Sequence, residues 1–249
     1  MSFIHTDINE KIATVKIIRN KVNALNDAVV DDLTYSLKEI AENSNIKSVV
    51  LTGQGSFFSF GFDVPGFMSY PKDSFESYVT KYSELVKNIF MFPKPVIAAI
   101  NGHAVAGGCV LAVACDRRIM QSGKPRIALN EMTFGSTLFS SVTEPLKYAA
   151  GPRNSENIIY SGTMLSAEEA QELGLVDEIY GEEQFEDKVS EVSSIFANKD
   201  LRAFASIKQL LKSDALDRIE SDEARSISEF VDIWYSESTR EQLANIEIR

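Results

Sequence analysis

The stretch VIAAINGHAVAGGCVLAVA, residues 96–114, joins a short apolar run to a glycine-rich turn and a second run of small residues. Val96 to Ile100 is typical of a strand buried on both faces, and Ala106 to Ala114 of a closely packed helix. Gly107 and Gly108 let a ligand approach the backbone where the N–H groups of a helix start are unpaired. The stretch therefore predicts an anion-binding strand-turn-helix, unless its glycines serve only helix packing.

The segments on either side repeat the alternation of strand and helix. Ile12–Ile18 and Lys47–Thr52 are predicted strands, and between them Asn26 caps a helix with apolar residues at helical spacing. Residues 74–92 predict another helix, which Pro93 stops. Two further short strands are predicted at residues 118–120 and 127–129. The fold class is therefore α/β, with layers of strands and helices outside them.

The C-terminal part of the chain is predicted to be helical. Ser166 to Glu169 is a helix-start signal, and later helices are expected at residues 185–197, 201–211 and 221–235. No repeat or flexible linker separates this part from the rest. We expect one continuous unit, with an α/β core over residues 1–190 and a helical region over residues 191–249.

Composition excludes several classes of function. The net charge of −11 and the pI near 4.8 argue against broad nucleic-acid binding, which needs a basic surface. Cys109 and Cys115 lie in an apolar run and predict two buried structural thiols rather than a disulfide. With His103 and His5 as the only histidines, no metal site is expected.

Targeting and membrane signals are also lacking. The N-terminus has neither a basic region nor an apolar core of the kind that signal peptides carry. The longest apolar stretch, Pro95–Cys115, is interrupted by polar residues and glycines, so no membrane span is expected. Glu247–Arg249 is not a peroxisomal tripeptide, and the expectation is a cytoplasmic protein.

A second glycine-containing segment follows the predicted strand at residues 47–52. Gly53 to Asp63 reads GQGSFFSFGFD, an apolar and aromatic loop at the carboxyl end of a strand, where α/β folds usually place ligands. Neither a Walker phosphate loop nor a dinucleotide fingerprint is present. Taken alone, the segment is equally compatible with a hydrophobic turn.

In order and spacing, these segments resemble the crotonase superfamily, the enoyl-CoA hydratase and isomerase family. Three stretches carry the resemblance: Asn23–Asn26, Ser59–Asp63 and Asn101–Gly108. Asp116–Ile119 and Ser166–Val176 support it, so it covers nearly the whole chain. The resemblance implies a crotonase-like ββα spiral core with a helical C-terminal region near subunit contacts, and a homotrimer or dimer of trimers.

The resemblance also implies a thioester site built from main-chain groups. The N–H groups of Phe62 and Gly107 would bind the thioester oxygen and stabilise an enolate, as fixed dipoles in a dry pocket do. Phe60 stands where the family usually has alanine, a departure that affects the acyl pocket or the loop. The substrate, of which coenzyme A is a part and not a cofactor, would contact a wider set of residues. Its members are Lys21, Ala24, Phe60, Gly61, Asp63, Val64 and Asn130.

The reaction depends on which acidic residues surround that site. Val110 occupies the position of the first of two glutamates that hydratases of the family use to activate water. Leu129-Asn130-Glu131 resembles the segment of mitochondrial-type Δ3,Δ2-enoyl-CoA isomerases that supplies a single base, and fits better than aligning Arg126 with the second hydratase glutamate. An apolar pocket would raise the pKa of Glu131, although a strand-end acid facing solvent is the structural alternative.

The resemblance thus favours a Δ3,Δ2-enoyl-CoA isomerase in which Glu131 moves a proton over an enolate held by Phe62 and Gly107. Two alternatives stay open. One is another crotonase-type reaction, namely hydration, thioester hydrolysis or decarboxylation. The other is a protein that binds acyl-CoA without turning it over, which the departures at Phe60 and Val110 motivate.

Overall fold

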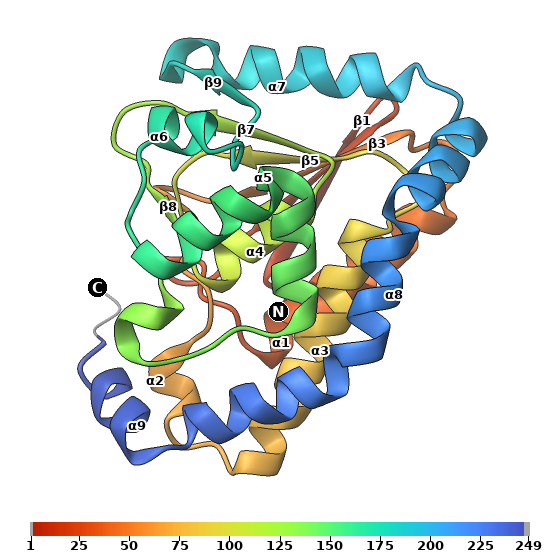
Figure 1. Ribbon diagram of the computed structural model, residues 1–249. Coiled ribbons are helices and arrows are strands. Elements are labelled where there is room, and N and C mark those ends of the chain that lie inside the picture. The colour runs from red at the N-terminus through yellow and green to blue at the C-terminus, as the bar shows by residue number, and fades with distance from the viewer. Residues whose placement is uncertain (1, 247–249) are drawn as a thin grey trace.

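The computed structural model describes residues 2–246, so the C-terminal Glu247–Arg249 lies outside the described part of the chain. The elements follow one another in an order that alternates strands and helices before becoming largely helical (Figure 1). They are β1 (Ile4–Asn9), β2 (Ile12–Ile17), α1 (Asp27–Glu42), β3 (Ser48–Gly53), β4 (Phe57–Ser59), α2 (Val64–Phe67), α3 (Lys72–Phe90), β5 (Val96–Ile100), β6 (His103–Val105), α4 (Gly107–Ala114), β7 (Arg117–Gln121), β8 (Ile127–Ala128), the 3₁₀ helix η1 (Glu131–Phe134), α5 (Ser140–Ser161), α6 (Ala167–Glu172), β9 (Glu178–Tyr180), α7 (Glu182–Ala197), α8 (Leu201–Trp234) and α9 (Glu237–Leu243).

A six-stranded sheet in the order β1-β2-β3-β5-β7-β9 forms the first layer. The β1–β2 pair is antiparallel and the other neighbours are parallel. Its central strands β3 and β5 are buried throughout, which explains their continuous apolar and β-branched sequences. The predicted strands at residues 12–18, 47–52 and 96–100 are confirmed to within a residue at their ends, whereas β1 had not been predicted.

The second layer is a small parallel sheet in the order β4-β6-β8. Each of its strands is followed directly by a segment named in the sequence analysis: the loop to α2, the start of α4, and η1. Since the carboxyl ends of parallel strands meet at one edge, this small sheet brings the three segments together.

Helices cover both faces of the large sheet. α7 lies across one face, at the top of Figure 1, and Phe185 and Val189 pack there against Val50, Ile97 and Ile119 of the strands. α1, α3 and α4 contribute to the main core on the other side. α8 runs beside α3 and ends close to α9 (Figure 1). α8 therefore runs from the region of α7 to the region of α9.

One helix prediction is wrong. Residues 201–211 and 221–235 were expected to form two helices, but α8 is continuous from Leu201 to Trp234. The residues between them include no glycine or proline, and Ala215 and Ile219 continue the buried face. The division at residue 190 stays a prediction, and that residue lies inside α7.

Three further expectations concern the cysteines, metal binding and membrane-spanning helices. Both cysteines are buried and free, as predicted. Between residues 2 and 246, no cluster of three or more histidine, cysteine or acidic side chains suits a metal ion. No helix in this range combines the length and apolar character needed to cross a bilayer.

Candidate active site

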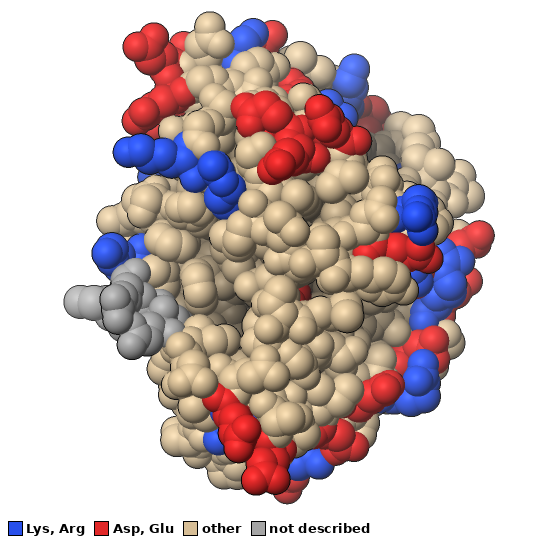
Figure 2. All heavy atoms as spheres, turned by 60° about the vertical axis from the view of Figure 1, so that its left-hand side comes forward, with Lys and Arg blue, Asp and Glu red and all other residues tan. Residues whose placement is uncertain are grey.

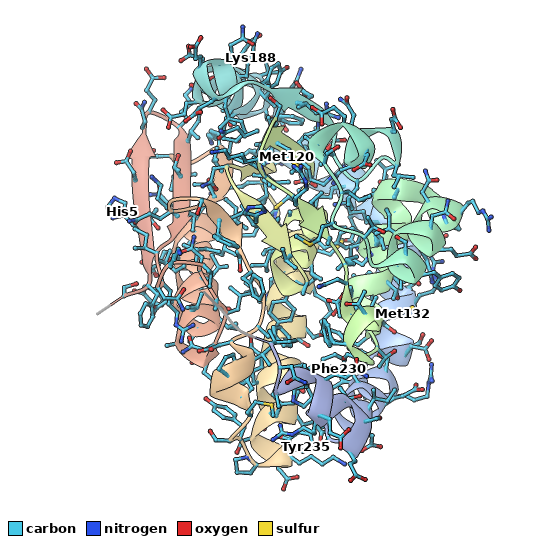
Figure 3. All side chains as sticks on the ribbon, turned by 90° about the vertical axis from the view of Figure 1, so that its left-hand side faces the viewer. His5, Met120, Met132, Lys188, Phe230 and Tyr235 are labelled. Carbon is cyan, nitrogen blue, oxygen red and sulfur yellow. The ribbon has the colours of Figure 1, made fainter. Side chains whose placement is uncertain are left out.

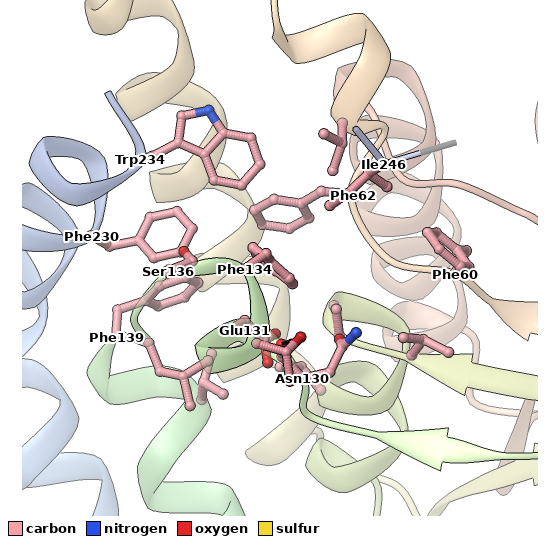
Figure 4. Close-up of a pocket in the computed structure, with 18 of the residues that line it drawn as sticks. Phe60, Phe62, Asn130, Glu131, Phe134, Ser136, Phe139, Phe230, Trp234 and Ile246 are labelled. Carbon is pink, nitrogen blue, oxygen red and sulfur yellow. Dashed lines mark hydrogen bonds between the residues drawn. The ribbon is translucent and has the colours of Figure 1, made fainter. Parts of the chain in front are cut away.

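A cavity of about 240 Å³ opens where the small sheet meets α5 and α8. On the face shown in Figure 2, a central hollow lies among uncharged residues and the charged side chains gather around the margin. Figure 4 shows the cavity itself, with Glu131 and Asn130 on one side and Phe62, Phe230 and Trp234 on the other. The lining is otherwise mainly aromatic and aliphatic: Phe60, Val64, Tyr82, Val105, Ala106, Gly107, Val110, Thr133, Phe134, Ser136, Leu138, Phe139, Val142 and Ile246.

The backbone N–H groups of Phe62 and Gly107 lie at this cavity, and neither has an acceptor among residues 2–246. Gly107 is the first residue of α4, where a helix leaves its N–H groups unpaired, and no side chain caps this helix. Phe62 is held by its neighbours, because Leu25 donates to the Gly61 carbonyl at 2.7 Å and accepts from the Asp63 N–H at 2.9 Å. Both N–H groups are therefore without a partner in the described chain, as the predicted thioester site requires.

Glycine is required where these two segments approach each other. Gly61 has φ of +93°, in the region that favours glycine. A Cβ atom on Gly61 would lie 2.8 Å from the Gly107 nitrogen and 2.8 Å from the Val105 carbonyl oxygen, closer than real contacts allow. The bare backbone of Gly61 thus allows the loop after β4 to lie against the start of α4.

Glu131 supplies the acid. It opens η1, is only 8% exposed, and is the one carboxyl among the described residues that line the cavity. Burial raises the pKa of Glu131 from 4.5 to about 7. Its Oε2 atom has no hydrogen-bond partner among residues 2–246. Glu131 is therefore a buried acid at the cavity, and the alternative of a strand-end acid that faces solvent is wrong.

An aromatic wall closes the side opposite Glu131. The Phe62 ring lies edge-on to Tyr78 at 5.0 Å and to Tyr82 at 4.9 Å between ring centroids, and further rings from α2, α3 and α8 surround it. Figure 3 shows Phe230 and Tyr235 at the end of the molecule opposite Lys188 of α7. The cavity therefore has polar side chains at residues 130, 131, 133 and 136, and the rest of its lining is mainly apolar, as suits an acyl chain.

The structure brings six of the predicted site residues to the cavity lining: Phe60, Phe62, Val64, Gly107, Asn130 and Glu131. The remaining four lie outside it. Lys21 is exposed, Ala24 is buried, and Gly61 lies behind the donor pair. Asp63 caps α2 by accepting a hydrogen bond from the Gly66 N–H, and it forms an ion pair with Arg19.

Two residues were missed by the sequence analysis. Arg19 donates to the Ala24 carbonyl at 2.9 Å and forms an ion pair with Asp63. It thereby joins the two segments that are predicted to contact coenzyme A. Tyr82 lines the cavity, but along the chain it is one of many apolar positions on a helix face. Neither residue belongs to a motif that could have identified it. Arg126, the rejected alternative to Glu131, donates to nearby backbone carbonyls and does not line the cavity.

Chemically, the arrangement combines two neutral donors with a carboxyl group that titrates near neutral pH. Such donors stabilise an oxygen on which negative charge develops. An acid whose pKa lies near the working pH can both take and return a proton. The apolar surroundings exclude water and strengthen both effects.

Comparison with known proteins finds a matching family and similar relatives. Residues 7–246 match the family described as enoyl-CoA hydratase/isomerase. The chain is 30% identical over 244 residues to a probable enoyl-CoA hydratase of Bacillus subtilis, covering 97% of this chain and 94% of that protein. It is 29% identical over 191 residues to the mitochondrial enoyl-CoA delta isomerase 1 of Mus musculus, covering 76% of this chain and 66% of that protein.

Among solved structures, the human mitochondrial delta3-delta2-enoyl-CoA isomerase superimposes with a TM-score of 0.91. The superposition covers 98% of this chain and 96% of that chain, at 24% sequence identity. At this identity the likeness concerns the fold. The relatives include both hydratases and isomerases, so they do not distinguish the two reactions.

Proposed function

The chain belongs to the enoyl-CoA hydratase/isomerase family and has the predicted crotonase fold, and we propose that it is a Δ3,Δ2-enoyl-CoA isomerase. The observation that carries the proposal is that Glu131 is the one carboxyl among the described residues that line the cavity. Val110 lines the same cavity, where the resemblance places the first glutamate of hydratases. One carboxylate is sufficient to move a proton, whereas the two-glutamate activation of water lacks one of its two groups among the described lining residues.

In the proposed reaction, the thioester oxygen of a 3-enoyl-CoA accepts hydrogen bonds from the N–H groups of Phe62 and Gly107. The Glu131 carboxylate removes a proton from C2, and the electron pair moves into the carbonyl to form a dienolate. The protonated Glu131 then gives a proton to C4, the carbonyl reforms, and the double bond lies between C2 and C3. One residue serves both carbons because they lie close together in one bound conformation.

The raised pKa of Glu131 suits both halves of this cycle. With a pKa of about 7, the free carboxylate is available near neutral pH, and its protonated form is not costly in the apolar cavity. A surface carboxyl with a pKa near 4.5 would be a weaker base.

We propose that coenzyme A itself lies along Ala24 and the segment from Gly61 to Val64, with the exposed Lys21 near its phosphates. Assembly as a homotrimer or dimer of trimers is also a proposal. It is supported by three large apolar side chains that α8 leaves exposed, those of Ile207, Leu210 and Leu211. Light scattering of the purified protein measures the subunit number.

The substitution Glu131→Gln tests the proposed function. It removes the base but keeps the shape, so isomerisation of 3-hexenoyl-CoA should fall about 10²–10⁴-fold while binding of hexanoyl-CoA persists. The formation of 2-enoyl-CoA is followed spectroscopically. Normal turnover by this variant would exclude Glu131 as the acid and base.

The hydratases among the relatives favour a second candidate, the addition of water to a 2-enoyl-CoA. Reactions in oxygen-18 water with mass spectrometry of the products separate the two reactions. An isomerase product carries no label, whereas hydration or hydrolysis incorporates it. Binding without any change of 2-enoyl or 3-enoyl substrates would instead indicate a non-catalytic acyl-CoA-binding protein.

A further inference from the structure

The hydroxyl group of Tyr82 contacts the backbone of the donor site directly. Tyr82 lies on α3, is 1% exposed, and its hydroxyl donates a hydrogen bond of 2.6 Å to the carbonyl oxygen of Gly107. Burial, and secondarily the charge of Glu131, raises the pKa of the Tyr82 phenol well above its usual value. The phenol therefore stays protonated and acts as a donor throughout the working pH range.

The backbone at this point needs support. Ala106, the residue before Gly107, has φ of 48° and ψ of −121°, a conformation that is unfavourable for a residue with a side chain. Such a conformation persists only where surrounding contacts hold it. Ala106 donates to the Ala128 carbonyl at 2.8 Å and accepts from the Val110 N–H at 3.0 Å, and both are backbone bonds.

The bond from Tyr82 is the side-chain contribution to this support. Gly107 has no Cβ atom, so the first turn of α4 and the bond to its carbonyl fix its orientation, and its N–H and carbonyl lie on either side of the same Cα atom. Holding the carbonyl therefore limits the directions in which the N–H can point. The Tyr82 ring also lies edge-on to Phe62, with centroids 4.9 Å apart and planes at 89°. One side chain thus contacts both residues that supply the donor N–H groups.

We infer that Tyr82 is a positioning residue that keeps the Gly107 N–H aimed at the thioester oxygen, acting through the Gly107 carbonyl and the Phe62 ring. This inference rests on the proposed role of the two N–H groups. It does not depend on which reaction follows, because hydration and isomerisation would both begin from the same bound carbonyl.

The matched test compares Tyr82→Phe with Tyr78→Phe. Tyr78 lies one turn earlier on α3, is fully buried, and is edge-on to Phe62, but its hydroxyl donates to the Leu25 carbonyl at 3.2 Å. Both variants lose one buried hydroxyl beside Phe62. Tyr78→Phe loses a long bond to the Leu25 carbonyl, which also accepts from the Asp63 N–H, and Tyr82→Phe loses the short bond to Gly107, so the difference between the variants isolates the contact with Gly107. Circular dichroism and the melting temperature of each variant establish that it is folded.

The first measurement is the infrared carbonyl band of bound hexanoyl-CoA labelled with carbon-13 at the carbonyl. This saturated thioester does not react, so the band reports hydrogen bonding alone. We expect the wild-type protein and Tyr78→Phe to shift the band to lower frequency, and Tyr82→Phe to lose most of that shift. In the isomerase assay, kcat of Tyr82→Phe should fall about tenfold or more, with KM changed much less.

An unchanged band and an unchanged kcat in Tyr82→Phe would overturn the inference. If Tyr82→Phe does not fold, 3-fluorotyrosine at position 82 keeps the ring and its hydroxyl and makes the phenol a stronger donor, at the cost of one added fluorine atom. The carbonyl band should then move with fluorination at position 82 and not at position 78. A wild-type protein that shifts the band but does not isomerise 3-enoyl-CoA would contradict the proposed function and leave the role of Tyr82 intact.

Discussion

Asp116 and Glu131 are carboxyl groups largely withdrawn from solvent, and their surroundings differ in every respect. Asp116 accepts from Lys208 at 2.9 Å, from Lys212 at 3.1 Å and from the Val96 N–H at 3.0 Å. Glu131 faces a cavity whose described lining contains no lysine or arginine. A fully paired acid holds α8 to the core, whereas the unpaired acid has a raised pKa that suits proton transfer. The contrast separates acids that stabilise the fold from the acid that we expect to do chemistry.

The largest effect is expected at the paired acid. Asp116→Asn leaves Lys208 and Lys212 buried without a counter-charge, so the free energy of unfolding should fall by about 3–5 kcal/mol. Burial lowers the pKa of Lys212 to about 8, so the loss should be greatest below pH 8, where Lys212 is charged. Urea denaturation at pH values below and above 8 measures this loss in the free energy of unfolding. The exposed Asp222, which pairs with Arg225, provides the control Asp222→Asn, for which the change should be under about 1 kcal/mol.

At Glu131, replacement of the acid by its amide should raise the free energy of unfolding, the opposite of the change expected at Asp116. The pKa of Glu131 is about 7 in the folded protein against 4.5 as its ordinary value, so folded-state stability falls as pH rises through that window. At pH 8, Glu131→Gln should therefore be more stable than the wild-type protein by about 3 kcal/mol, a difference that vanishes below about pH 4. Denaturation at both pH values measures this. A destabilised Glu131→Gln at pH 8 would remove the contrast with Asp116.

The smallest of these effects concerns the rate. Protonation of Glu131 removes the base, so kcat/KM for 3-hexenoyl-CoA should fall about tenfold per pH unit below a pKa of about 7. Hexanoyl-CoA binding over the same range is the control, since it does not use the base. A profile that stays flat down to about pH 5 would show that Glu131 is not the titrating group.

Local signals in the sequence were sufficient for much of the fold. The strand at Val96–Ile100 and the helix after Gly107 follow from apolar runs and glycines within a few residues of each other. Glu131 is conspicuous because it is an isolated acid in a nearly apolar segment. The continuity of α8 was missed because the apolar face weakens between Lys212 and Ile219, although nothing there ends a helix.

Contacts between residues far apart along the chain could not be predicted from such local signals. Tyr82 bonds a carbonyl 25 positions away, and Arg19 pairs with an acid 44 positions away. An apolar helix face does not indicate which of its tyrosines will meet a functional peptide group. The unusual conformation of Ala106 was likewise hidden, because alanine carries no sequence preference for positive φ.

The double attachment of Phe62 has a consequence for how the protein should respond to heat. Its N–H is one of the two donors, while its ring is enclosed by others from α2, α3 and α8. The surrounding rings are among the most buried side chains of the main core, so this part of the molecule should open only when the core itself unfolds. We therefore expect activity and secondary structure to be lost in the same transition on warming.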